Sequence, residues 1–194
     1  MLLSVLALTL AAAPAQRAPR PGTRFPTLMI KRVLWLPATA SYTSTEGALS
    51  PKLACDGANI GLPAPKGPYL TVKMDDVKAA VKANDLKTAT GGSPEGSKEN
   101  WSPEGALKIA KQFKADYYGM VKITDALRVE IAGVKSVEVR SLVSLYDATG
   151  HVVVENEPLR ARDKSTNPNA REAAFALGKT VIPDWYKANV PKPK

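Results

Sequence analysis

Few side chains in this sequence have the type and spacing that catalysis requires. His151 is the only histidine, and it directly follows Gly150. A histidine can act as a general base near neutral pH, and Asp147, four residues earlier, could orient it. Because an aspartate at the first position of a turn is already explained by the turn itself, we interpret His151 as a surface turn residue. The sequence therefore predicts no catalytic residue.

Cofactor and metal sites are equally hard to build from these residues. Gly91-Gly92-Ser93 lacks the spacing and the lysine of a phosphate-binding loop. A single cysteine, Cys55, and a single histidine cannot form a standard structural zinc site or an internal disulfide. Cys55 is expected to be either a buried small hydrophobe or a free thiol able to link two chains. We therefore expect no cofactor, no metal and no enzymatic activity.

Two aromatic residues in loop segments are the candidates for contact with a partner. Tyr42 lies in the segment 39–68, which is rich in Ser, Thr, Gly and Pro, and Trp101 follows the polar segment 91–100. Long loops in compact domains often carry function, and tyrosine and tryptophan anchor many interfaces. For Trp101, packing beside a helix start is the structural alternative.

The net charge of +9 is concentrated at the two ends of the chain. Five basic residues and no acid lie between positions 17 and 32, and three basic residues and no acid lie between 187 and 194, so the body between them is nearly neutral. A nucleic-acid-binding protein is expected to carry a basic stripe on a folded face, and none is indicated. The arms could touch anionic lipid or polymer weakly, or could be solvated linkers.

The first segment, Met1 to Ala15, is apolar and ends in Ala-Pro-Ala, the pattern of a cleaved secretory signal. We expect a signal peptide over 1–15, a basic Pro-containing linker over 16–31, one domain over 32–188 and a basic tail over 189–194. The protein is then exported, to the periplasm or beyond the cell, with association with the outer membrane as one destination.

Hydrophobic patterning predicts the elements of the first half of the domain. The run Arg32 to Pro37 is typical of a buried strand. Thr71 can cap a helix whose apolar residues are spaced by three and four, and a brief strand is expected over 86–90. Ser102-Pro103 then begins a second helix, with a capping residue followed by proline at the first helical position.

The second half alternates apolar and polar residues along three strands. Tyr117 to Ile131, Val137 to Leu145 and the segment after Gly150 form an antiparallel meander with one face buried. Asn169 begins a closing helix with Glu172 supporting its cap. Glu155 and Glu157 share a strand face near arginines, where solvated edges are the common explanation. The sequence predicts a single α/β domain with a mixed sheet, in the order β-α-β-α-β-β-β-α, and helices on the sheet faces.

Several of these segments together resemble a known group of cell-envelope domains. They are a Leu-Trp-Leu-Pro first strand, the stretch Gly105 to Val121 with its Ala-Asp-Tyr-Tyr-Gly junction, and the turn in Leu145 to Val153 with Asp-Ala-Thr-Gly. This order is similar to the domain shared by the TolB amino-terminal region, CsgG and the outer-membrane activators of penicillin-binding proteins. The resemblance implies a non-enzymatic module that works by protein contact in the periplasm or at the outer membrane.

Two functions remain as the main hypotheses; a third, a hydrolase using Ser or Asp without His, is disfavoured because no activated nucleophile is visible. The first is an exported cell-envelope adaptor that binds an envelope protein, which the resemblance and the shortage of catalytic groups favour. The second is a periplasmic small-ligand-binding protein with a pocket under the segment 39–68, because open α/β sheets bind ligands at the carboxyl ends of their strands. The sequence identifies neither the partner nor the ligand, and it does not give the oligomeric state.

Overall fold

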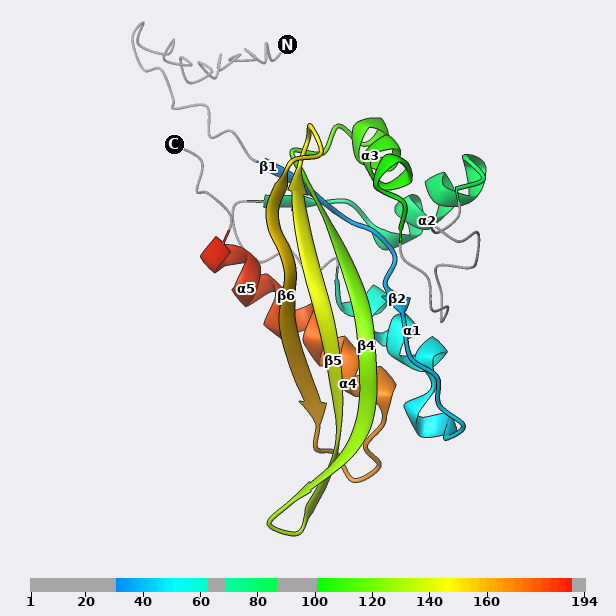
Figure 1. The fold of residues 1–194 in the computed structure, drawn as a ribbon, viewed down its shortest axis with the longest axis vertical. Coiled ribbons are helices and arrows are strands. Elements are labelled where there is room, and N and C mark those ends of the chain that lie inside the picture. Colours follow the sequence, from blue (N-terminus) through cyan, green and yellow to red (C-terminus); the bar gives the residue numbers. More distant parts are fainter. Residues whose placement is uncertain (1–30, 63–68, 87–100, 190–194) are drawn as a thin grey trace, which may run out of the picture.

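A mixed open sheet carries the fold, as the sequence predicts, and it has six strands where the sequence predicts five (Figure 1). The computed structural model describes residues 31–62, 69–86 and 101–189. The strands are β1 (Lys31–Trp35), β2 (Thr39–Ala40), β3 (Tyr69–Thr71), β4 (Tyr117–Ile131), β5 (Val134–Asp147) and β6 (Val152–Asp163). The helical segments are η1 (Gly47–Leu49), α1 (Pro51–Gly61), α2 (Met74–Ala83), α3 (Pro103–Gln112), α4 (Ala170–Ala176), η2 (Leu177–Val181) and α5 (Ile182–Asn189).

The predicted first strand, β1, lies in the middle of the parallel part of the sheet. It pairs in parallel with β3 on one side and with β4 on the other, in the sheet order β3-β1-β4-β5-β6. Side chains of β1 alternate between two cores, because Val33 and Trp35 face one and Leu34 faces the other. Burial on both faces explains why this segment is a continuous apolar run.

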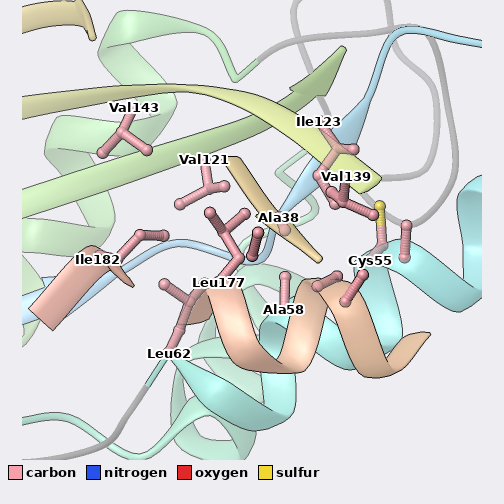
Figure 2. Packing of buried hydrophobic residues seen from close by; sticks show 14 of the residues in the cluster. Ala38, Cys55, Ala58, Leu62, Val121, Ile123, Val139, Val143, Leu177 and Ile182 are labelled. Carbon is pink, nitrogen blue, oxygen red and sulfur yellow. The ribbon is translucent and has the colours of Figure 1, made fainter. Parts of the chain in front are cut away.

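The helices divide between the two faces of the sheet. α1, α4, η2 and α5 supply most of the larger core, which Figure 2 shows between the sheet and the crossing helices. α2 and α3 supply the smaller core on the other face. Cys55 belongs to the larger core and its thiol is fully buried, so it is a small hydrophobe rather than an exposed thiol.

The meander of β4, β5 and β6 agrees with the predicted alternation. Both residues at the tip of the β4–β5 hairpin have positive φ, Ala132 at 51° and Gly133 at 78°, as the common two-residue hairpin turn requires. At the β5–β6 turn, the Asp147 carboxylate accepts hydrogen bonds from the backbone N–H groups of Thr149 and His151. The His151 side chain is 86% exposed, so it is the surface turn residue that the sequence predicts.

The segment 39–68 is not the long loop that its composition indicates. It contains β2, η1 and the eleven-residue helix α1, which forms part of the connection between the parallel strands β1 and β3. Six of the eleven α1 residues are buried, many of them small. Small residues and glycines resemble loop composition, but here they allow α1 to approach α4 closely.

Two other boundaries differ from the sequence expectation. Thr71 ends β3, and α2 begins at Met74 with Lys73 as its capping residue, which makes no side-chain cap. The strand expected over 86–90 falls almost entirely outside the described residues. By contrast, Ser102 caps α3 by accepting a hydrogen bond from Gly105 N–H at 3.1 Å, and Asn169 caps α4 in the same way through Glu172 N–H.

The closing helix contains a π-helical segment, η2, between α4 and α5. Pro183 lies in the first turn of α5, where it has no N–H to donate to a carbonyl one turn earlier. A π-bulge before a proline lets the helix continue without that hydrogen bond. The helix nevertheless keeps a buried apolar face, because Ala170, Ala174 and Leu177 are fully buried.

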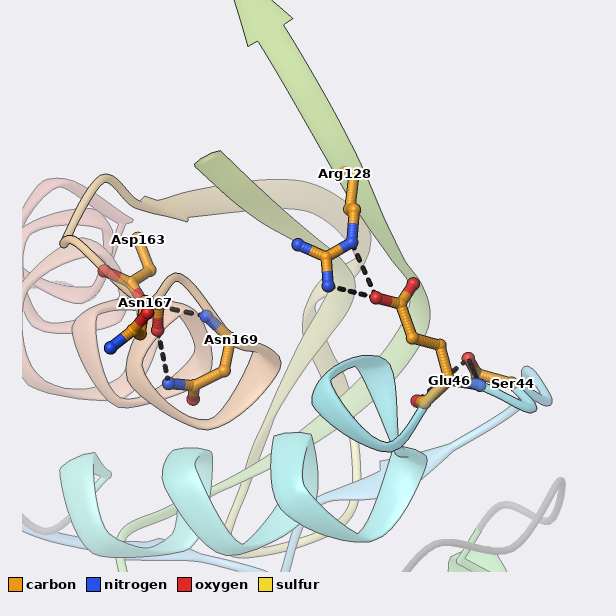
Figure 3. Close-up of polar contacts among 6 residues, drawn as sticks. All are labelled: Ser44, Glu46, Arg128, Asp163, Asn167 and Asn169. Carbon is orange, nitrogen blue, oxygen red and sulfur yellow. Dashed lines mark hydrogen bonds and ion pairs between the residues drawn. The ribbon is translucent and has the colours of Figure 1, made fainter. Parts of the chain in front are cut away.

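Two carboxylates, Glu46 and Asp163, hold the segments next to η1 and α4 in place (Figure 3). Glu46 pairs with Arg128 and so ties the segment before η1 to β4. The Asp163 carboxylate, at the end of β6, accepts hydrogen bonds from Ser165 N–H at 2.9 Å, Ser165 Oγ at 3.1 Å and Asn169 N–H at 2.9 Å. Asp163 thereby positions the capping residue of α4.

We expect Asp163→Ala to lower the free energy of unfolding by about 2 kcal/mol, because it leaves two backbone N–H groups near a buried site without their acceptor. For a chain of this size the midpoint of thermal unfolding should fall by roughly 4–8 °C. Circular dichroism melting measures this. Asp163→Asn keeps one acceptor oxygen and should lose less, and an equal loss in both variants would contradict the assigned hydrogen bonds.

Candidate functional site

One face of the meander lies away from the larger core and is not covered by α4. On β5, Val137, Val139 and Val143 point into that core, so the alternating residues point outward. The helical segments with the most contacts to β5 and β6 are α4 and η2, which belong to the core side. Figure 1 shows α4 behind the meander strands, with the opposite face toward the viewer. We call this face the meander face; its charged residues are Lys122, Asp125, Glu138, Arg140, Arg160 and Arg162.

Glu138 is the central charge of the meander face. Although its side chain is on the outward side of β5, its exposed fraction is 0%. Its two carboxylate oxygens accept hydrogen bonds from Arg140 Nε at 2.9 Å and Arg162 Nε at 2.5 Å. The hydrogen bond from Arg140 and the charge and hydrogen bond of Arg162 hold the pKa of Glu138 below its ordinary value, although burial opposes this shift. Glu138 is therefore an anion that orients two guanidinium groups.

The arginines outnumber the carboxylate that holds them. Strand register places Arg162 directly opposite Glu138, and places Arg160 directly opposite Arg140. Like charges at directly opposed positions are unfavourable in a sheet. Arg140 and Arg162 are held through Nε, and Arg160 is exposed. This arrangement presents several guanidinium donors to solvent on one face, which suits the binding of carboxylate or phosphate groups.

A hollow of about 470 Å³ continues the meander face toward α3. Its lining combines aromatic, apolar, basic and small polar side chains: Thr39, Trp101, Pro103, Met120, Val121, Lys122, Leu142, Ser144, Tyr146 and Asn156. The Tyr146 ring stacks on the Tyr118 ring with 5.1 Å between centroids, which holds this part of the wall in place. The hollow and the arginines together give a partner both apolar contact area and charge.

The structure places the two predicted contact residues on opposite sides of the sheet. Trp101 belongs to the smaller core, is 4% exposed, and donates from Nε1 to the Pro37 carbonyl at 2.9 Å. Its packing agrees with the structural alternative, and its ring also lines the hollow. Tyr42 packs against the larger core and donates from its hydroxyl to the Leu49 carbonyl at 2.9 Å. Contact of either residue with a partner stays a prediction.

Burial affects the chemistry of Tyr42. It raises the pKa of the phenol above its ordinary value, and the nearby Cys55 and Asp125 raise it further. The Tyr42 hydroxyl therefore stays protonated at neutral pH and acts as a hydrogen-bond donor. This favours a structural role in holding the segment before α1.

Sequence patterning missed Glu138, because an acidic residue at an outward strand position is normally a solvated one. The sequence favours solvated edges for Glu155 and Glu157, with Arg160 or Arg162 as neighbours in the alternative. In the structure Arg162 pairs with Glu138 across the strands. The signal that could have found this pair is the register between Glu138 and Arg162. That register depends on the bulges in β5 and β6, which the sequence does not locate.

Within the described ranges, no group of three or more His, Cys, Asp or Glu side chains is arranged to hold a metal ion. Among the same residues, no helix is both long enough and apolar enough to span a membrane.

Comparison with known proteins gives similarity in structure at low sequence identity. The chain is similar to lipoprotein GNA1162 from Neisseria meningitidis, with 15% identity, a TM-score of 0.48, and coverage of 81% of this chain and 99% of that one. It is also similar to the hypothetical protein CT253 from Chlamydia trachomatis, with 16% identity, a TM-score of 0.48, and coverage of 80% and 95%. The LpoB C-terminal domain from Salmonella enterica is similar with 13% identity, a TM-score of 0.39, and coverage of 70% and 83%.

No family model and no curated protein matches the sequence. Since the structural similarities have TM-scores below 0.5, they do not assign a family or a function to this chain. The part of the sequence resemblance that names TolB and CsgG stays a prediction.

Proposed function

We propose that the protein is an exported, non-enzymatic interaction domain of the cell envelope that binds a protein partner through the meander face. The observation that carries this proposal is the buried Glu138 carboxylate, which orients Arg140 and Arg162 beside the exposed Arg160. The excess of guanidinium groups on an uncovered sheet face supports a role in recognition.

The charge of the meander face indicates an acidic partner. Its four basic residues and two acidic residues leave it positively charged, and guanidinium groups match carboxylates with two parallel hydrogen bonds. The hollow beside α3 provides contact area for an apolar or aromatic side chain of the same partner. An acidic protein segment with an apolar anchor fits both parts.

The site of action follows from the first residues of the sequence. The apolar segment Met1 to Ala15, which lies outside the described residues, is typical of a secretory signal and supports export. The resemblance of the sequence to envelope domains supports the periplasm or the outer membrane as the destination.

Site-specific cross-linking tests the proposal. A photo-reactive phenylalanine derivative at position 160 should capture one envelope protein, which mass spectrometry identifies, and the same group at position 179 on η2 should not capture it. With the purified partner, Arg160→Glu should weaken binding about tenfold or more, and added salt should weaken binding to the wild type. Lys108→Glu, an equal charge change on α3, is the matched control. Equal effects of both substitutions would refute the assigned surface.

A further inference from the structure

A second cavity lies between three helices, α1, α2 and α4. It has a volume of about 750 Å³, within the usual range of small-molecule sites. α1, the start of α2 and the first turn of α4 form its walls. Its lining residues are Leu53, Asp56, Asn59, Ile60, Lys73, Met74, Asp75, Lys78 and Arg171. The segment 39–68, for which the sequence predicts a ligand pocket, contributes four of them.

Asn59, in the lining of this cavity, has a buried donor that no atom of the described residues accepts. Its exposed fraction is 3%, and its Oδ1 accepts a hydrogen bond from Ala38 N–H at 2.7 Å. Because a backbone N–H can only donate, this bond fixes the orientation of the amide and leaves Nδ2 as the remaining donor. Among the described residues, the buried Nδ2 has no hydrogen-bond partner. A buried polar group without a partner is destabilising, and such groups in native proteins call for an explanation.

The charges that line the cavity favour an anionic ligand. Lys73, Lys78 and Arg171 are basic, and Asp56 and Asp75 are acidic. Asp56 is already paired with Lys52, at 2.7 Å. The start of α2 adds a partial positive charge, because the capping residue Lys73 makes no side-chain cap to its first N–H groups. Without the Asp56–Lys52 pair, the lining has three basic residues and one acidic residue, so it favours an anionic ligand.

Apolar residues also line the cavity, and the apolar surface extends into a neighbouring hollow. Leu53 and Met74 line it, and Ile60, which is 56% exposed, lies at its border. Ile60 and Arg171 also line a neighbouring hollow of about 190 Å³, together with Phe175. An exposed isoleucine next to buried small residues is the kind of surface that an aliphatic ligand covers.

We infer that this cavity binds a small amphipathic carboxylate. The carboxylate accepts hydrogen bonds from Asn59 Nδ2 and Arg171, and the aliphatic chain lies along Leu53 and Ile60. The site is on other elements than the meander face, so it would be a second binding function of the same domain, independent of the proposed partner.

Three probes of equal chain length test this inference: octanoate, octanol and octylammonium, each below its micelle concentration. In NMR titrations of the isotopically labelled mature chain, octanoate should shift the amide signals of α1 and of the start of α2. Octylammonium should cause no such shifts, and octanol should bind at least tenfold more weakly than octanoate. Equal binding of octanol and octanoate, or no binding of octanoate, would overturn the inference.

Two substitutions test the assigned donors. Asn59→Asp keeps the acceptor for Ala38 N–H but replaces the free donor with an oxygen, so octanoate should bind about tenfold or more weakly. Arg171→Met removes an exposed guanidinium and should weaken binding by a similar factor without a loss of stability. Lys187→Met on α5 is the control and should bind octanoate as the wild type does. Unchanged affinity in Arg171→Met would overturn the assigned donor even if Asn59→Asp failed to fold.

Discussion

Gly57→Ala is expected to lower the free energy of unfolding by about 3 kcal/mol or more, because α1 has no room for a methyl group where it crosses α4. A Cβ atom at position 57 would overlap the backbone oxygen and carbonyl carbon of Arg171. Backbone atoms cannot rotate away as a side chain can, so the two helices would have to move apart. The same crossing is tight at Gly61, where a Cβ would lie 2.6 Å from the Phe175 carbonyl oxygen.

Thermal unfolding followed by circular dichroism measures this effect. For a chain of this size the midpoint should fall by roughly 6–12 °C in Gly57→Ala. Gly47→Ala is the matched control, since a Cβ at Gly47 in η1 meets no atom within 4 Å, and its midpoint should change little. Equal midpoints in the two variants would show that α1 and α4 are not packed as closely as the structure has them.

The elements that could be predicted from the sequence are those with local signals, unlike the crossing of α1 and α4. The meander could be predicted because each of its strands alternates apolar and polar residues, and that pattern is local. α3 and α4 could be predicted because Ser102 and Asn169 are capping residues next to helical patterns. These signals lie within a few residues of one another, so no tertiary contact is needed to recognise them.

α1 has no such local signal. Its buried positions include Gly57, Gly61 and Asn59, which are typical of loops when they are considered without their neighbours. The glycines are required by α4, which is more than a hundred residues later in the sequence, and Asn59 binds the backbone of Ala38. Because these reasons are long-range contacts, the helix and the cavity beside it could not be predicted from composition.

The candidate site follows the same rule. Glu138 is an acidic residue at an outward strand position, so the sequence predicts that it is solvated. Only the register of β5 and β6 shows that Arg162 lies opposite to it. The same register places Arg160 beside Arg140, and it explains why this face carries more positive charge than its strands need for stability. The residues that support the proposed function were thus present in the predicted elements, but their grouping depended on pairing between strands.

Glu138→Ala is expected to lower the free energy of unfolding by about 3 kcal/mol at pH 7, since it removes two charged hydrogen bonds. The pKa of Glu138 is lowered in the folded protein from its ordinary value of 4.5, so its stabilising effect is fully present above that value. It is lost as the pH falls through the folded-state pKa. Urea unfolding at pH 7, 5 and 3 should therefore give a difference between wild type and Glu138→Ala that shrinks toward acid.

Comparing wild type with Glu138→Ala separates the effect of Glu138 on stability from that of the other carboxylates. The pKa of Asp147 is also lowered, chiefly by the hydrogen bond from the Thr149 hydroxyl, but that contribution is common to both proteins and cancels in the difference. Glu138→Gln keeps the size of the side chain and removes only its charge, so it should show the same pH dependence as Glu138→Ala. A difference that stays constant from pH 7 to pH 3 would mean that packing, and not the bonds to Arg140 and Arg162, accounts for the loss. In that case the two arginines would not depend on Glu138 for their orientation, and the meander face would lose its organising charge.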